Sequence, residues 1–186
     1  ISTNYLIFEQ GRVSSKKTRI IASQQQVIRY DRECTDEITS KSQENILKIL
    51  AKIIKKYDIL LLSDYGKGLL TKNLTQSIIS LAKKNSIKTL VDPKGHDYSK
   101  YQGAFLLTPN KKEAGEATKT SINDNASLKK VIKQLKDEIK LGVSLITLSE
   151  QGIAAYDEDL KIYPTTSREV YDVTGAGDTI IAALGF

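Results

Sequence analysis

The feature that most limits the fold of this chain is a repeated pattern: a short, largely apolar run, then a polar loop, then a helical periodicity. The runs lie at residues 59–62, 87–91, 104–107 and 143–148. Short continuous apolar runs are typical of strands buried on both faces, and helices between them require parallel pairing. The pattern predicts an α/β fold with a doubly wound, mainly parallel sheet and helices on both faces.

Polar signatures follow these runs directly: "SDYGKG", "DPKG", "TPNKKE" and "SEQG". Open α/β sheets bind their ligands beyond the carboxyl ends of the strands, so we expect a binding site where the four loops meet. Residues 5–32 instead carry the β-branched pattern of extended edge strands. The chain is therefore predicted to be one partial domain, with an edge segment at 1–34 and an α/β core at 35–186.

Charge and composition exclude several classes of protein. The 28 basic and 22 acidic residues give a net charge of +6, and many lysines fall on predicted helix surfaces. Trp is absent and Arg is sparse, so we do not expect nucleic-acid binding, although the charge is compatible with a phosphorylated small molecule. Cys34 is the only cysteine, which excludes an intrachain disulfide. No segment approaches the ~20 apolar residues that span a bilayer, so we expect a cytoplasmic protein.

The stretch "TGAGDT" near the end of the chain has the composition of an anion site. Gly175, Ala176 and Gly177 open a predicted helix, and Asp178 follows at once. Amide groups at a helix start attract anions, and small residues let a phosphate approach them. A tight turn with an acid that favours the helix dipole is an equal alternative. If a phosphoryl group passes across the helix start, the amides stabilise its charge while Asp178 accepts the proton of the acceptor hydroxyl.

These motifs resemble those of the ribokinase-like (PfkB-type) sugar kinases. "DVTGAGDT" resembles the C-terminal signature of that family, which implies that Asp178 is the catalytic base and that the preceding Gly-Ala-Gly amides form the anion hole. The resemblance also implies an ATP-dependent kinase. "TPNKKEA" is similar to the family motif that organises Mg²⁺ and the ATP phosphates, here with Asn110 and Glu113.

"TLSEQG" resembles the nucleotide-binding turn of the same family. The resemblance assigns Thr147, Ser149 and Gly152 to the nucleotide, and many members have Gly where this chain has Ser149. The lid that covers the sugar in such kinases, and that makes their dimer, corresponds to the edge segment. A homodimer through the lid is therefore expected.

From about Gly11 to the end, the chain is most similar to the family of D-glycero-β-D-manno-heptose 7-phosphate kinases, through "SDYGKG", "DPKG" and "LLTPN" together. This similarity implies transfer of the ATP γ-phosphate to the anomeric hydroxyl. The product is heptose 1,7-bisphosphate, on the way to ADP-heptose and the lipopolysaccharide core. In some members a nucleotidyltransferase domain follows the kinase.

The ends of the chain bear on its activity. It contains no Met, begins within a pattern and ends within an apolar helical run, so we expect a piece of a longer protein. The N-terminal substrate motif of the family and the residues beyond Phe186 are absent. We therefore expect little or no activity from these 186 residues alone.

Four further residues have two interpretations each. Lys94 either neutralises a phosphate or is a solvated loop lysine. Asp64 and Lys67 either face the sugar or its 7-phosphate, or Asp64 caps a helix while Gly66 and Gly68 make a turn. Arg29 either binds the 7-phosphate or forms an ion pair with Asp31 or Glu33.

Asp172 and Thr174 are expected to brace the anion-hole turn. Two rival functions remain open at this point. One is another sugar or nucleoside kinase of the same fold, and the other is a non-catalytic nucleotide-binding module.

Overall fold

The computed structural model describes residues 3–23, 25–165 and 175–186, and its main body is a six-stranded sheet with the order β3-β4-β5-β6-β7-β8. The strands are β3 (Ile59–Ser63), β4 (Lys88–Asp92), β5 (Leu106–Leu107), β6 (Val143–Thr147), β7 (Ile153–Tyr156) and β8 (Leu160–Tyr163). The first four pair in parallel, and the last two continue the sheet as an antiparallel hairpin. The predicted α/β fold with a mainly parallel sheet is confirmed.

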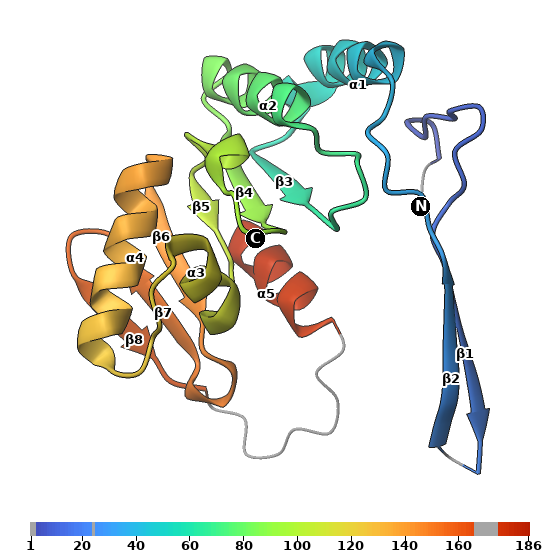
Figure 1. The fold of residues 1–186 in the computed structure, drawn as a ribbon. Helices are drawn as coiled ribbons and strands as arrows, with labels where there is room; N and C mark the ends of the chain where they lie inside the picture. The colour runs from blue at the N-terminus through green and yellow to red at the C-terminus, as the bar shows by residue number, and fades with distance from the viewer. Residues whose placement is uncertain (1–2, 24, 166–174) are drawn as a thin grey trace.

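Helices cover both faces of this sheet, as Figure 1 shows. They are α1 (Ser40–Ile53), α2 (Lys72–Lys84), α3 (Lys111–Thr118), α4 (Asn125–Ile139) and α5 (Ala176–Gly185), with short 3₁₀ turns at Ile54–Lys56, Ser99–Tyr101 and Ser149–Gln151. Alternate strand residues point to opposite faces. Val91, Leu107 and Ile146 pack in one cluster with α2, α3 and α4, while their neighbours Leu90 and Leu145 pack against Ile181 of α5.

The edge segment forms a hairpin of its own. Strands β1 (Lys16–Ala22) and β2 (Gln25–Arg32) pair antiparallel, and every described side chain in them is exposed. In Figure 1 the hairpin stands away from the main sheet. A two-stranded ribbon is marginally stable alone, so its position depends on what holds its root.

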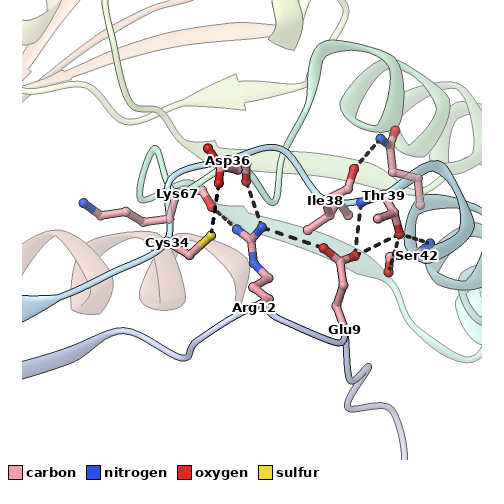
Figure 2. A network of polar contacts seen from close by, with 9 residues as sticks. Glu9, Arg12, Cys34, Asp36, Ile38, Thr39, Ser42 and Lys67 are labelled. Atoms are coloured by element: carbon pink, nitrogen blue, oxygen red, sulfur yellow. Dashed lines mark hydrogen bonds and ion pairs between the residues drawn. The ribbon is translucent and has the colours of Figure 1, made fainter.

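The root of the hairpin is held by a polar network that Figure 2 shows. The Arg12 guanidinium donates to the Asp36 carbonyl at 2.8 Å and also to the Lys67 carbonyl, which joins the root to the loop after β3. The Ile38 amide donates to the Gly68 carbonyl at 3.0 Å. Gly68 has φ +73°, and a Cβ there would lie 1.9 Å from the Asp36 carbonyl oxygen, so only glycine permits this approach.

Side-chain caps fix where several helices begin. Thr39, Thr71 and Asp124 each accept a hydrogen bond from an amide in the first turn of α1, α2 and α4. Among the helices of the described ranges, none is long and apolar enough to cross a membrane.

Candidate active site

The loops that follow β3 and β4 and one face of the hairpin enclose a cavity of 370 Å³. The hairpin contributes Lys17, Arg29, Asp31 and Glu33, the two loops contribute Asp64, Tyr65, Lys67, Asp92, Pro93 and Lys94, and α3 contributes Glu113. The cavity therefore lies beyond the carboxyl ends of β3 and β4. Residues of the predicted loops "SDYGKG", "DPKG" and "TPNKKE" line it, whereas none of "SEQG" does. Five carboxylates and four cations line it, so its chemistry depends on which of these charges are neutralised.

Asp178 lies in the first turn of α5, and its side chain is exposed. The Tyr65 hydroxyl donates a hydrogen bond to Asp178 Oδ1 at 3.2 Å, which links the helix start to a residue that lines the cavity. Gly175 has φ +76°, and a Cβ built at Gly175 or Gly177 would meet no described residue within 4 Å. Small residues of this kind at a helix N-terminus are compatible with the close approach of an anion.

Two residues of the same signature, Asp172 and Thr174, lie outside the described residues. Their predicted bracing role stays a prediction.

Asp92 is a cavity residue that the sequence interpretation missed. Burial, and then the nearby carboxylates of Glu113 and Asp178, raise the pKa of Asp92 from 3.8 to about 6. A signal was present, because Asp92 ends an apolar strand at the edge of the sheet where ligands bind. Perturbed pKa values of this kind are common at functional sites.

Asn110 and Glu113 form a reciprocal helix cap. The Glu113 amide donates to Asn110 Oδ1 at 2.9 Å, and the Asn110 amide donates to Glu113 Oε2 at 3.1 Å. The other Glu113 oxygen, Oε1, lies 3.2 Å from Lys94 Nζ. The side-chain oxygens of this pair are thus engaged within the protein. No group of three metal-ligating side chains occurs among the described residues, and the predicted role of this pair toward Mg²⁺ stays a prediction.

Asp64 is buried beneath the loops rather than presented to the cavity mouth. Its carboxylate accepts hydrogen bonds from the Gly66 amide at 2.7 Å, from Lys100 Nζ at 2.6 Å and from the Tyr101 hydroxyl at 2.7 Å. The alternative that Asp64 caps a helix is wrong, because α2 begins after Thr71. The alternative that Gly66 makes a turn agrees with its φ of +64°.

The cations predicted to bind the sugar phosphate both have carboxylate partners. Arg29 contacts Asp31 through two nitrogens, Nε to Oδ1 at 3.0 Å and Nη2 to Oδ2 at 2.8 Å. Lys67 forms an ion pair with Glu33. The ion-pair interpretation of Arg29 is therefore correct, while phosphate binding by Arg29 and Lys67 stays a prediction.

Three residues predicted to bind the nucleotide, Thr147, Ser149 and Gly152, lie at the end of β6 and in the turn that follows it. Thr147 ends β6 and forms a parallel bridge with Asn110, and both Asn110 and Ser149 line a second cavity of 650 Å³. Ser149 has φ +53°, in the left-handed region that favours glycine, the residue that the family resemblance leads us to expect here. Gly152 has φ +98°, and a Cβ there would lie 2.0 Å from the Tyr163 carbonyl oxygen.

Comparisons with known proteins bear on the family and the fold of this chain. The sequence model of the "pfkB family carbohydrate kinase" matches residues 1–185. The "Bifunctional protein HldE" of Aliarcobacter butzleri is 62% identical over 186 residues, which are 100% of this chain and 39% of that protein. The protein of the same name from Sulfurimonas denitrificans is 55% identical over 186 residues, again 39% of its length. The chain thus spans well under half of these relatives.

Solved structures share the fold at low identity. Phosphofructokinase-2 from Escherichia coli has a TM-score of 0.70 and 19% identity, with 85% of this chain and 53% of that chain covered. Arabidopsis thaliana ribokinase, solved with ribose and ATP, has a TM-score of 0.61 and 18% identity over 81% of this chain and 46% of its own. The fold follows from the structures and the family from the sequence match: this chain belongs to the pfkB family of carbohydrate kinases.

Proposed function

We propose that the full-length protein transfers the γ-phosphoryl group of ATP to the anomeric hydroxyl of D-glycero-β-D-manno-heptose 7-phosphate. The product is the 1,7-bisphosphate, on the way to ADP-heptose and the lipopolysaccharide core. Identity of 62% to a protein named HldE and the combined motifs of the strand-end loops support this substrate. The observation that carries the chemistry is Asp178, exposed in the first turn of α5 and hydrogen-bonded to Tyr65, a residue that lines the cavity.

Asp178 is the proposed general base. A carboxylate is a weak base, but late proton removal in a loose phosphoryl-transfer transition state does not need a strong one. ATP supplies the migrating phosphoryl group. The amides at Gly175, Ala176 and Gly177 point out of the first turn of α5, where backbone donors have no partner within the helix, and they stabilise the migrating charge.

The nucleotide is proposed to lie toward Thr147, Ser149 and Gly152, where Ser149 and Asn110 line the 650 Å³ cavity. Lys94, half-exposed at the mouth of the first cavity, is proposed to approach the phosphates. Mg²⁺ commonly keeps several waters and is held by substrate phosphates, so it is proposed to arrive with the nucleotide. Asn110 and Glu113 then affect it indirectly, by fixing the start of α3.

The hairpin is proposed to act as the lid and as the contact of a homodimer. Its exposed apolar side chains support this proposal, because such side chains commonly mark a surface that a partner or a ligand covers. They are Ile20, Ile21, Val27, Ile28 and Tyr30. The word "bifunctional" in the relatives' name supports a further catalytic domain, proposed to be a nucleotidyltransferase, and a cytoplasmic setting is proposed for the pathway.

The substrate proposal is tested by ADP release from the full-length protein with heptose 7-phosphate, unphosphorylated heptose, and no sugar. We expect turnover with heptose 7-phosphate and a kcat/KM at least 100-fold lower for the unphosphorylated sugar, since a lost charge-assisted contact costs about this factor. Equal use of both sugars would favour another sugar kinase of this fold. Nucleotide binding without ADP release from any sugar would favour a non-catalytic module. The 186 residues alone are expected to be nearly inactive in the same assay.

A further inference from the structure

We propose that Lys17 binds the phosphate that the sugar substrate already carries, and that this lysine sets the preference for a phosphorylated sugar. The inference rests on the proposed kinase function and names a specificity residue of its acceptor site. It follows from the position of Lys17 in the hairpin, from the pairing of the other cations, and from the way the hairpin is held.

Lys17 lies on the face of the hairpin that encloses the cavity. It stands opposite Asp31 in the strand register, and it lines both the 370 Å³ cavity and an adjoining cavity of 330 Å³. Neighbouring strand residues point to opposite faces, so Lys16, which stands opposite Arg32, faces away from both cavities. The chain therefore offers a matched lysine one position earlier that does not face the site.

The other cations of the 370 Å³ cavity are already neutralised. Arg29 is held in a two-point contact by Asp31, Lys67 is paired with Glu33, and Lys94 lies 3.2 Å from Glu113. Lys17 has no hydrogen bond or ion pair with any residue in the described part of the chain. Lys17 faces Asp31 across the strand pair and interacts with it electrostatically, but no carboxylate of the described residues holds it in direct contact. A dianionic phosphate entering this cavity gains most from such a cation, because displacing a carboxylate that is in direct contact costs free energy.

The contacts of the hairpin root fix the position of the hairpin, and so of Lys17, relative to the loop after β3. The Arg12 guanidinium donates to the Asp36 carbonyl in the root and to the Lys67 carbonyl in the loop after β3, and so joins the two segments (Figure 2). That loop carries Tyr65, which lines both cavities and donates to Asp178. Tyr65 thus connects the proposed base with the cavities that Lys17 lines, as an acceptor with its reacting hydroxyl at one end and its phosphate at the other requires.

The test compares Lys17→Gln with Lys16→Gln in the full-length protein. For Lys17→Gln we expect KM for heptose 7-phosphate to rise roughly 10- to 100-fold, the loss typical of one charge-assisted contact. KM for ATP and the kcat/KM for unphosphorylated heptose should stay within about twofold. Lys17→Arg should restore most of the affinity, and Lys16→Gln should match the wild type. A KM for heptose 7-phosphate unchanged in Lys17→Gln overturns the proposal, as does an equal loss with both sugars.

Direct binding separates this proposal from the kinase proposal. Line broadening in ³¹P NMR reports binding of heptose 7-phosphate, and of inorganic phosphate as a minimal probe, without turnover. Wild-type binding that is lost in Lys17→Gln, with no ADP release from either protein, would leave the Lys17 assignment standing while the kinase proposal fails. Binding that is equal in the two proteins, or absent from the wild type, overturns the assignment of Lys17.

Discussion

The Tyr65 hydroxyl donates a hydrogen bond to Asp178 Oδ1 at 3.2 Å, and so joins two residues that lie 113 positions apart in the chain. Tyr65 belongs to the loop after β3. Asp178 lies in the first turn of α5, the helix that packs against β3 and β4 through Ile181. The contact makes the orientation of the proposed base depend on the loop that lines the acceptor cavity.

Tyr65→Phe is expected to lower kcat about tenfold, because one hydrogen bond to a charged group that positions the base is worth about that factor. KM for ATP and the melting temperature should not change, since the Tyr65 ring is 58% exposed. Steady-state kinetics and a thermal melt check this. Tyr57→Phe is the control, because Tyr57 is 54% exposed and lies away from the site after α1. A kcat equal to that of the control would show that the Tyr65 contact has no catalytic role.

Tyr101→Phe is expected to destabilise the fold by about 1–3 kcal/mol, since it leaves the buried Asp64 short of one donor. The Tyr101 hydroxyl also accepts from the Lys94 amide at 3.0 Å, so the change loosens the loops after β3 and β4 together. Urea unfolding measures the effect.

Tyr98→Phe is a matched control for that change. The Tyr98 ring lies 5.9 Å from the Tyr101 ring, but the buried Tyr98 hydroxyl has no hydrogen-bond partner among the described residues. Removing it should be neutral or stabilising. An equal loss of stability in both variants would contradict the assignment of the Tyr101 hydroxyl as the link.

Asp92→Asn is expected to raise the melting temperature at pH 8 but not at pH 4. The pKa of Asp92 is raised from 3.8 to about 6, so the folded state holds this proton more tightly than the unfolded chain. The stability contributed by Asp92 is therefore complete below about pH 4 and is lost as the pH rises through about 6. Asparagine stays neutral at every pH. Melting temperatures of the wild type and of Asp92→Asn, measured between pH 4 and pH 8, report how the difference between the two proteins changes with pH.

Asp159→Asn should behave in the opposite way. The hydrogen bond from Lys129 lowers the pKa of Asp159, so its stabilising effect is present at neutral pH and is lost in acid. Asp159→Asn should lower the melting temperature at pH 7 and have less effect near pH 3. An Asp92→Asn difference that does not vary with pH would contradict the assigned environment of Asp92.

Gly68→Ala is expected to destabilise the protein by several kcal/mol and to release the hairpin root. The new Cβ would lie 1.9 Å from the Asp36 carbonyl oxygen, in addition to the strain of φ +73°. Gly95→Ala isolates the second effect, because φ is +92° there and nothing lies within 4 Å of the Cβ. It should cost about 1–2 kcal/mol. Urea unfolding midpoints and limited proteolysis of the hairpin distinguish Gly68→Ala from Gly95→Ala. Equal midpoints for the two variants would argue against the close approach of Gly68 to the Asp36 carbonyl oxygen.

Much of the fold could be predicted because its signals are local. The apolar runs at 59–62, 87–91, 104–107 and 143–148 contain β3, β4, β5 and β6. The loops at the carboxyl ends of the strands gathered at one edge of the sheet, as parallel pairing requires. Gly175 and Ala176 begin α5 where the small-residue stretch predicted a helix start.

The pairing of side chains across the site could not be predicted in the same way. Arg29 and Asp31 share a face of the hairpin because they are two residues apart in β2, but whether that face lines the cavity depends on how the hairpin root is held. The contact between Tyr65 and Asp178 depends on how α5 packs. The Asn110–Glu113 cap had a local signal, an Asn followed three residues later by Glu, but the kinase motif gave the same two residues another role.

The most direct test of the account is the turnover number of Asp178→Asn in the full-length protein. This change keeps the size of the side chain and removes only its ability to accept a proton. We predict a kcat reduced by about 10²- to 10⁴-fold, the range for loss of a general base, with unchanged melting temperature and unchanged KM for ATP. A kcat within threefold of the wild type would contradict the assignment of Asp178 as the base and, with it, the proposed role of the α5 start.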